Sequence, residues 1–452
     1  MRDLLSIGTS RGCEMIGTGL GLGLAGYRIN PAGMMLPVLD INFRDFKSFS
    51  STIGPTASFS RASSGTYFDE TGVLRTASTN VGRINHVYNG STWVCKGGLI
   101  EAQRTNIAQY TEDFSNVYWT KSGISVAANN TAAPDGNTTA DKIVENSSSG
   151  IKYGTISGGF SVTSGVSYCF SVFAKGAGRY LGFATNSTAF PNAIGAVFNL
   201  SNGTISNIQA NTTAAIQDVG NGWYRCSITG SANATTTTNI NFGVSNDLNQ
   251  IYPSYTGNGS SGYFLWGFQI EAEASFASSY IPCLSNSSTT RSADLMQITG
   301  SNFSGFYNST QGSFTVEYER NGYASGSYPP VFYAYDSALP GGRVIGVTGN
   351  NNAGGGESFW VADTSFQAQI VAGSMLATGA TGKVAACYKA NDFAASLNGA
   401  AIVSDTSGTL PTVNSLNIGS NGAGDAFTNG HIARLRYWNT RLDNATLRAL
   451  ST

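Results

Sequence analysis

Apolar and polar residues alternate with a period of two in many short segments of the chain, and this alternation predicts β-strands. Two clear examples are Leu-Asp-Ile-Asn-Phe at 39–43 and Phe-Thr-Val-Glu-Tyr at 314–318. Further strands are predicted at 57–61, 66–68, 73–75, 167–174, 196–200, 204–205, 222–228, 262–270, 384–388, 393–397 and 430–438. A short helix is predicted near Asp443–Leu450, with Asp443 as its N-cap.

Tight turns separate several of these strands. Asn202-Gly203 lies between the strands predicted at 196–200 and 204–205, and Asn398-Gly399 follows another strand. An Asn-Gly pair supplies the positive φ angle that a hairpin turn needs. Because no amphipathic helix lies between the strands, we expect an all-β protein built of tandem β-sandwich or jelly-roll domains.

With 452 residues, the chain has room for two or three domains. The pattern divides it into four ranges: an apolar, Gly-rich N-terminal arm at 1–50, a β-rich shoulder at 51–105, a β-sandwich at 106–290 and a jelly roll at 291–452. The polar run Ser-Asn-Ser-Ser-Thr-Thr at 285–290 is the expected linker between the last two ranges.

Charged residues make up only 11% of the chain, and 25 basic residues nearly balance 26 acidic ones. Such a chain lacks the dense basic face that binding to nucleic acid requires. Gly is frequent, at 56 residues, but aromatic residues reach 11%, which argues against disorder. This composition suits short strands joined by tight turns.

The six cysteines are widely scattered, at Cys13, Cys95, Cys169, Cys226, Cys283 and Cys387. They form no CxxC pair, so the sequence supports neither a zinc knuckle nor a redox motif. We expect isolated, buried thiols, as in a protein that assembles in a reducing cytoplasm, although a disulfide stays open.

The stretch 15–26 is apolar, and every second residue from Gly17 to Gly23 is Gly. It is shorter than the roughly 20 apolar residues that span a bilayer, and its glycines make a poor signal-peptide helix. We therefore interpret it as part of an arm that docks on a neighbouring protein. The expected anchoring residues are Ile16, Leu20, Leu22, Leu24 and Tyr27.

An ordered series of short motifs between about 40 and 295 resembles a region that recurs in phage and prophage structural proteins. The motifs are Phe59-Ser60-Arg61-Ala62-Ser63, Thr66-Tyr67-Phe68-Asp69, Gly72-Val73-Leu74, Arg83, Gly98-Leu99-Ile100-Glu101, Arg104-Thr105-Asn106, Glu112-Asp113-Phe114-Ser115, Trp119-Thr120-Lys121, Ala133-Pro134-Asp135-Gly136, Thr139-Ala140-Asp141-Lys142, Gly222-Trp223-Tyr224-Arg225, Trp266-Gly267-Phe268-Gln269-Ile270-Glu271 and Ser279-Tyr280-Ile281-Pro282. These motifs resemble the carbohydrate-binding-module-like sandwich of tail fibres and head spikes. From about 291 onward the chain resembles a concanavalin A-like, or laminin-G-like, jelly roll. The segments that carry this resemblance are Phe314–Tyr318, Leu397-Asn398-Gly399, Leu416-Asn417-Ile418-Gly419 and the closing strand with Leu442 after it.

These resemblances imply a structural, non-enzymatic component of a phage virion, assembled in the host cytoplasm. It would be a tail fibre or spike that is attached to other virion proteins by the N-terminal arm. It would form a homotrimer, in agreement with the closed symmetry of homo-oligomers. Its distal sandwiches would contact host surface polysaccharide, and we expect neither nucleic-acid binding nor membrane insertion. One alternative is a head-attached capsid fibre or decoration protein without primary receptor binding.

A less favoured alternative is a polysaccharide depolymerase, which needs two carboxylates flanking the glycosidic bond. Glu271 and Glu273 are two positions apart and could share one face of a strand, but such a pair arises easily by chance. The only histidines, His86 and His431, are expected in different domains, so a Ser-His-Asp set is hard to build. The sequence nominates no catalytic residue.

No cofactor is expected. Calcium is the one metal considered, because concanavalin A-like domains often bind it through clustered oxygen ligands. Asn391, Asp392 and Asp425 are available, but they form no dense acidic loop.

Sugar rings stack on exposed aromatic side chains while nearby polar groups bind the hydroxyls. Trp360 follows a Gly-rich segment and is the first candidate for a glycan contact, with Trp438 and Trp119 behind it. Trp223 and Trp266 lie within strand patterns and are expected in the core.

Overall fold

The computed structural model describes residues 35–191, 193–322, 328–350 and 355–452. Those residues form antiparallel sheets with three short helices, which confirms the predicted all-β class. The anchoring residues predicted at Ile16, Leu20, Leu22, Leu24 and Tyr27 lie outside the described residues. So does Cys13. Residues Val38–Thr452 cluster as one unit, and the description below concerns that unit.

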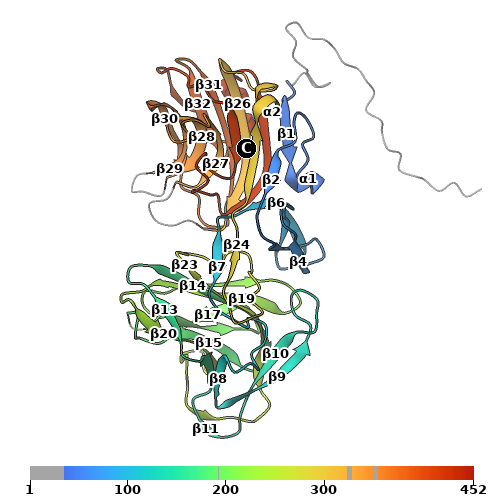
Figure 1. The fold of residues 1–452 in the computed structure, drawn as a ribbon, viewed down its shortest axis with the longest axis vertical. Coiled ribbons are helices and arrows are strands. Elements are labelled where there is room, and N and C mark those ends of the chain that lie inside the picture. Colours follow the sequence, from blue (N-terminus) through green and yellow to red (C-terminus); the bar gives the residue numbers. More distant parts are fainter. Residues whose placement is uncertain (1–34, 192, 323–327, 351–354) are drawn as a thin grey trace, which may run out of the picture. The chain divides into compact units, whose positions relative to one another are not determined.

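The range 106–290 contains a sandwich of two six-stranded antiparallel sheets (Figure 1). The first sheet has the order β18 (Thr213–Asp218), β19 (Trp223–Ser231), β14 (Ser167–Ala177), β23 (Gly262–Ala272), β10 (Ala140–Glu145), β9 (Ile124–Thr131). The second has the order β17 (Thr204–Ser206), β16 (Gly195–Asn199), β15 (Tyr180–Thr185), β21 (Ile240–Ser245), β12 (Tyr153–Ile156), β8 (Trp119–Ser122).

Alternation along β14 explains how these two sheets pack. Phe170, Val172 and Ala174 point into the shared core, whereas Ser171 and Phe173 point to the other face. The core also takes Phe183 and Phe242 from the second sheet. Burying a large apolar side chain contributes roughly 1.5–3 kcal/mol, so this double layer of aromatic residues stabilises the sandwich.

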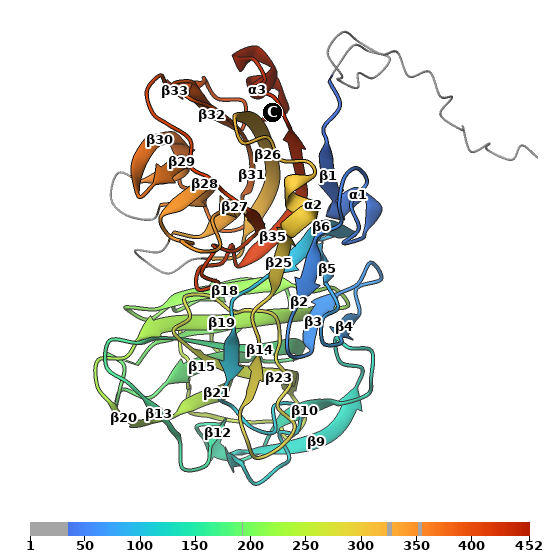
Figure 2. The same cartoon turned by 45° about the horizontal axis from the view of Figure 1, so that its top comes forward.

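A second sandwich lies toward the C-terminus (Figure 2). Its eight-stranded sheet has the order β33 (Val403–Asp405), β32 (Phe393–Leu397), β31 (Thr381–Lys389), β26 (Gln311–Arg320), β35 (Gly430–Trp438), β6 (Trp93–Ile100), β5 (Ile84–Tyr88), and β1 (Leu39–Asn42) also pairs with β35. The facing seven-stranded sheet has the order β2 (Ser58–Ser60), β25 (Leu295–Thr299), β34 (Ser415–Ile418), β27 (Pro330–Tyr335), β28 (Arg343–Gly349), β29 (Gly356–Asp363), β30 (Ser365–Ser374).

Strands from the ranges 1–50 and 51–105 therefore lie in the same two sheets as strands from the range 291–452. In β1, Leu39 is opposite Tyr437 and Ile41 is opposite Leu435, and both β1 side chains are fully buried in the core of this sandwich. β6 pairs with the start of β35, and β2 pairs with β25. The 106–290 sandwich is thus an insertion between two segments that complete the other sandwich.

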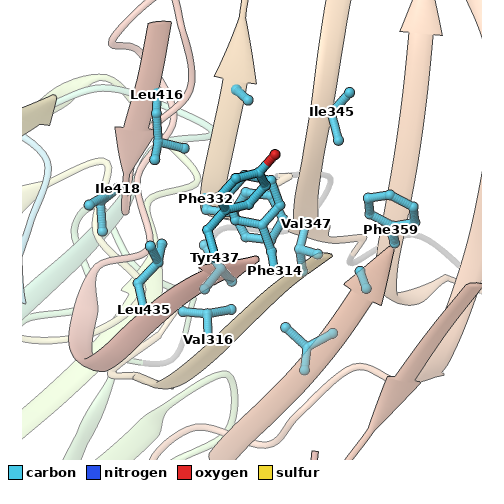
Figure 3. Close-up of a cluster of buried hydrophobic side chains, with 14 of the residues drawn as sticks. Phe314, Val316, Phe332, Ile345, Val347, Phe359, Leu416, Ile418, Leu435 and Tyr437 are labelled. Atoms are coloured by element: carbon cyan, nitrogen blue, oxygen red, sulfur yellow. The ribbon is translucent and has the colours of Figure 1, made fainter. Parts of the chain in front are cut away.

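The core of the C-terminal sandwich is aromatic at its centre and aliphatic around it (Figure 3). The rings of Phe314 and Phe332, one from each sheet, stack with centroids 4.3 Å apart, and Tyr437 lies 4.5 Å from Phe314. Val316, Ile345 and other branched side chains fill the space around them. Phe314 and Tyr437, which are 123 positions apart in sequence, are joined in this way.

The remaining strands form two-stranded ribbons: β3 (Gly65–Phe68) with β4 (Leu74–Ala77), β7 (Arg104–Asn106) with β24 (Thr289–Arg291), β11 (Ser149–Gly150) with β22 (Tyr255–Thr256), and β13 (Phe160–Val162) with β20 (Thr236–Thr238). The helices are α1 (Phe43–Phe46), α2 (Gly300–Ser304) and α3 (Asn444–Leu450). The Asp443 carboxylate accepts from the Thr446 backbone N–H, so the predicted helix and its N-cap are confirmed. Within the described ranges, no helix has the length and apolar character of a membrane span.

A buried cluster of charges joins several of the short motifs that carry the phage-protein resemblance. Asp294 accepts from the Arg61 guanidinium at 3.0 Å, and Arg83 pairs with Glu101 at 2.9 Å. Ser279, from the other sandwich, donates its backbone N–H to Glu101 at 2.8 Å. Burial favours the protonated Glu101, but nearby arginines outweigh it and hold the pKa of that carboxyl far below its usual range. These motif residues therefore serve the junction between the two sandwiches.

Candidate functional site

Aromatic side chains line the outer face of the seven-stranded sheet. Tyr333 and Tyr335 from β27 have ring centroids 6.0 Å apart, and Tyr333 lies 5.7 Å from Trp360 of β29. Phe366 of β30 lies a further 5.7 Å from Trp360. Their neighbours Phe332 and Phe359 point into the core, so strand alternation places Tyr333, Tyr335 and Trp360 on the opposite face.

Phe366 reaches this face because of a β-bulge. Val361 is opposite Ala368 and Ala362 is opposite Phe366, so β30 holds one extra residue between the two pairs. Such a bulge re-aims the side chains on one side of it. It moves Phe366 from the core side of β30, where Ala368 points, to the outer face beside Trp360.

One cross-strand row runs through the centre of the group. In register order it holds Asn417 of β34, Tyr333, Gly346 of β28, Trp360 and Gln369 of β30. A Cβ atom on Gly346 would lie 2.9 Å from the Phe332 carbonyl oxygen and 3.3 Å from the Tyr333 ring. The glycine thus leaves the space in which the two rings on either side of β28 approach each other.

A groove with a volume of about 710 Å³ runs over this face. Volumes of about 300–1,000 Å³ are typical of small-molecule sites. Besides Tyr333, Trp360 and Phe366, its lining combines further apolar residues with a set of polar ones. The polar side chains are Arg104, Thr348, Asn350, Ser358, Gln369, Asn421, Asp425 and Asn429.

The electrostatics of the groove favour hydrogen bonding over ionic binding. Burial raises the pKa of Tyr333 to about 12, with Asp425 acting in the same direction, so its phenol stays neutral at physiological pH. The buried Trp360 Nε1 has no hydrogen-bond partner among the described residues, and its N–H is a donor that a ligand can use. The Asn421 amide donates to Asp425 at 2.6 Å and fixes that carboxylate at the rim.

Trp360 is thus placed where the sequence analysis expected it to be useful, but the other two tryptophan candidates are not. Trp119 is 1% exposed, stacks on Phe114 with centroids 5.2 Å apart, and donates to the Tyr110 carbonyl oxygen. Trp438 is 3% exposed and packs near the Arg436 guanidinium. Neither ring face is open to a sugar. Trp119 points into the core of its sandwich, and Trp438 is buried on the face of β35 opposite to the core residues Leu435 and Tyr437.

The tryptophans expected in the core, Trp223 and Trp266, are buried, which confirms that prediction. Among the cysteines that the structure describes, Cys169, Cys226, Cys283 and Cys387 are buried free thiols. Cys95 is a half-buried free thiol.

The carboxylates Glu271 and Glu273 do not share a strand face. Glu271 is fully buried, and its carboxylate accepts from the Ser278 backbone N–H at 3.0 Å. Strand β23 ends at Ala272, and Glu273 has a left-handed φ of 54°, so the alternation breaks between the two. The suggestion that Glu271 and Glu273 share one face of a strand is therefore wrong.

The expectation that the two histidines lie in different domains is also wrong. His86 is on β5 and His431 is on β35, and both strands belong to the eight-stranded sheet. Asn85 donates its amide to His431 Nε2 at 2.9 Å. The sequence pattern missed this arrangement because β5 and β6 belong to a sheet whose strands β26 and β35 come more than 200 residues later.

The three calcium candidates are engaged by protein donors. Arg441 donates to Asp392 at 2.8 Å, the Gly408 backbone N–H donates to Asn391 at 3.1 Å, and Asp425 is held by Asn421. In the parts of the chain that the structure describes, no group of three acidic, His or Cys side chains is arranged to hold a metal ion.

Most of the groove residues escaped the sequence analysis. Val331-Phe332-Tyr333-Ala334-Tyr335 is apolar throughout, so its outward tyrosines resemble core residues. Phe366 depends on a bulge, which leaves no sequence signal. Gly346 within a strand pattern was the one available sign, since such a glycine marks a close approach or a bulge.

Comparison with known proteins identifies no family: no family model matches the chain, and no curated protein matches it. Among solved structures, a partial likeness is found to domain 4 of AbnA, a GH43 extracellular arabinanase from Geobacillus stearothermophilus, in complex with arabinotriose. The TM-score is 0.27 at 18% identity, and the match covers 35% of this chain and 73% of that chain. A likeness at this level carries no argument about function.

Proposed function

We propose that this chain is a non-enzymatic, glycan-binding structural protein whose groove on the C-terminal sandwich binds surface carbohydrate. The observation that carries the proposal is the cross-strand row in which Tyr333 and Trp360 flank Gly346, with Phe366 beside them. Ring faces next to amide and hydroxyl groups are the combination that sugars need, because one face of a sugar is apolar and its edge is polar.

The rings are inclined to one another: the Tyr333 and Trp360 planes differ by 64°, and those of Trp360 and Phe366 by 57°. Platforms that turn from one ring to the next suit a glycan whose successive residues also turn, and they suit a flat ribbon-like chain less well. Gln369 and Asn421 lie along the same groove and supply donors and acceptors for the hydroxyls.

We place this binding protein in a phage virion, as a tail fibre or spike, on the strength of the motif resemblance described above. Trimerisation and attachment through the N-terminal arm belong to the same proposal. Immunogold labelling of intact particles with an antibody against residues 291–452 tests it. Gold at the tail is expected. Gold over the head would favour a head-attached fibre or decoration protein, and unlabelled particles would contradict a virion role.

The glycan-binding part is tested on an array of host polysaccharides with the full chain. We expect Trp360→Ala and Phe366→Ala to reduce binding at least 10-fold. Phe46→Ala is a matched control, because Phe46 and Phe366 are both 62% exposed but Phe46 lies on α1. Equal loss in all three variants, or binding unchanged by Trp360→Ala, would overturn the groove as the site. Turnover of the polysaccharide would overturn the non-enzymatic role.

A further inference from the structure

A second concave site lies between the two sandwiches and borders the aromatic groove at Phe276, which lines both. It is a cleft with a volume of about 680 Å³. One wall is the outer face of β18 and β19, where small polar side chains alternate with the core residues. The other wall comes from the eight-stranded sheet. The first wall presents Thr213, Ala215, Gln217, Arg225, Ser227 and Thr229, and the second presents His86, Lys96, Glu319 and His431.

His431 presents a hydrogen-bond donor to this cleft. The side-chain oxygen Oδ1 of Asn85 accepts from the Phe68 backbone N–H. The side-chain NH₂ group of Asn85 is therefore the one that faces His431 Nε2, at 2.9 Å. Nε2 is therefore an acceptor, and in the neutral ring the proton is on Nδ1. That Nδ1–H has no partner among the described residues. The nearest Glu319 oxygen, at 3.9 Å, is too distant for a direct hydrogen bond.

His86 presents the complementary acceptor. Its Nδ1 donates to the Phe68 carbonyl oxygen at 3.3 Å, which leaves Nε2 of the neutral ring with a lone pair and no partner within the described ranges. The rings of His86 and His431 are both more than nine-tenths buried. Unpartnered polar atoms in such a position cost free energy unless a bound molecule satisfies them.

Arg225 adds a third unsatisfied group to the same cleft. Its two terminal nitrogens donate to the Ser278 carbonyl oxygen at 2.6 Å and to the Ser171 hydroxyl at 3.1 Å, and its guanidinium lies 5.3 Å from the Phe173 ring centroid. The Nε–H of Arg225 is buried and unpartnered in the part of the chain that the structure describes. The guanidinium is thus rigidly held, with one donor left over.

The formal charges that line the cleft cancel. Lys96 and Arg225 are the cations, and Glu101 and Glu319 are the carboxylates. Lys96 donates to Glu319 at 2.7 Å, and Glu101 pairs with Arg83 of the buried cluster. Neither carboxylate is without a cation, and the carboxylates of Glu271 and Glu101 act electrostatically on the Arg225 guanidinium, so the cleft offers an ionic ligand no uncompensated charge.

We propose that this cleft is a second binding site, for a short uncharged oligosaccharide. A hydroxyl group both donates and accepts, so the hydroxyls of an oligosaccharide offer the partners that the His431 Nδ1–H, the His86 Nε2 and the Arg225 Nε–H lack. The hydroxyls of Thr213, Ser227 and Thr229 on the first wall supply further partners. The proposal rests on none of the groove residues Tyr333, Trp360 and Phe366, nor on a virion setting.

The two histidines of the chain make a selective probe, because it has no others and both line the cleft. Long-range ¹H–¹⁵N spectra of the full chain are recorded while maltotriose, cellotriose or mannotriose is added. Trialanine and trigalacturonate are added in separate titrations, to test for a peptide ligand and for an anionic one. We expect at least one neutral trisaccharide to shift the ring signals of both histidines. The shift should be equal in Trp360→Ala and lost in Ala215→Trp, which places an indole on the exposed wall of the cleft.

Val117→Trp is the matched control, because Val117 is 90% exposed and does not line the cleft. Unchanged circular dichroism of both tryptophan variants guards against misfolding. Histidine signals that respond to none of the neutral probes overturn the cleft site even where the groove still binds glycan. A response to trialanine or trigalacturonate alone, or one that survives Ala215→Trp, overturns the proposal as well.

Discussion

Tyr333 and Trp360 lie on strands that are separated by a third strand, yet their ring centroids are only 5.7 Å apart. The residue between them in register is Gly346. Any side chain at that position would stand between the rings and fill the floor of the groove. The spacing of the two rings therefore depends on a residue that has no side chain with which to contact a ligand.

Replacement of Gly346 by Ala is expected to reduce glycan binding several-fold and to destabilise the sandwich by about 1–3 kcal/mol. The new Cβ would lie 2.9 Å from the Phe332 carbonyl oxygen, so the backbone must shift, and Tyr333 must move with it. Binding is measured by calorimetry, and stability by urea denaturation. Gly341→Ala is the control, since a Cβ there meets no atom within 4 Å. Equal effects of the two changes would contradict the role given to Gly346.

The buried charge cluster is expected to be the most sensitive part of the fold. Asp294→Asn leaves Arg61 and Arg83 buried without their shared carboxylate, and breaking a buried pair costs about 3–5 kcal/mol. Asp392→Asn, at a 45% exposed carboxylate that pairs with Arg441, should cost about 1 kcal/mol at most. Urea denaturation of the two variants compares them directly. A similar small cost for both would mean that the cluster does not secure the junction.

The parts of the fold that the sequence could predict are those that depend on residues close to one another in the chain. Alternation predicted β26 and β35, the Asn-Gly pairs predicted turns, and Asp443 predicted a helix N-cap. Each of these signals depends on residues close in sequence. The pairing of β1 with β35 could not be predicted, because contacts across nearly 400 residues leave no local pattern. The same limit hid the convergence of Arg61, Glu101 and Asp294.

The groove shows the second limit. Trp360 was a candidate because it followed a Gly-rich stretch, but its partners came from strand register and from one bulge. Trp119 and Trp438 failed as candidates because alternation by itself does not say which face of a strand other parts of the chain cover. Which tryptophans are exposed is decided by tertiary packing.

A fragment that lacks residues 1–34 is expected to fold and to lose incorporation into particles. Strand β1 begins at Leu39, so this deletion leaves its pairing with β35 intact. Unchanged thermal unfolding together with loss of the protein from purified particles is the expected result. Deletion through residue 42 is the contrasting variant, since it removes the buried Leu39 and Ile41 and should destabilise the sandwich. Particles that still carry the shorter deletion would contradict an anchoring arm.

Acid is expected to destabilise the fold through His431. Burial is the largest cause that lowers the pKa of its imidazole from 6.5 to about 3, although Glu101 opposes the shift. The imidazole of the unfolded chain thus binds a proton below pH 6.5, whereas that of the folded chain binds it only near pH 3. This contribution to the free energy of unfolding is complete above that range. It falls by about 1.4 kcal/mol per pH unit as the pH drops.

Glu112 acts in the opposite direction over much of the same range. Burial raises the pKa of its carboxyl from 4.5 to about 7, although the Tyr280 hydroxyl, which donates at 3.0 Å, opposes the shift. The folded chain therefore keeps a proton that the unfolded chain releases. This contribution is fully present below pH 4.5 and is lost as the pH rises toward 7.

Between pH 4.5 and 6.5 the two groups are therefore expected to cancel, so the free energy of unfolding of the wild-type chain should change little with pH. Glu112→Gln should make stability rise with pH in this window, and His431→Gln should make it fall, each with a slope near 1.4 kcal/mol per pH unit in magnitude, about one proton. Urea denaturation at half-unit pH steps measures all four chains. The double variant supplies the background of the remaining groups, including Asp141, whose pKa burial raises. Slopes of the same sign in both single variants would show that one of the two carries no net proton difference between the folded and unfolded chain.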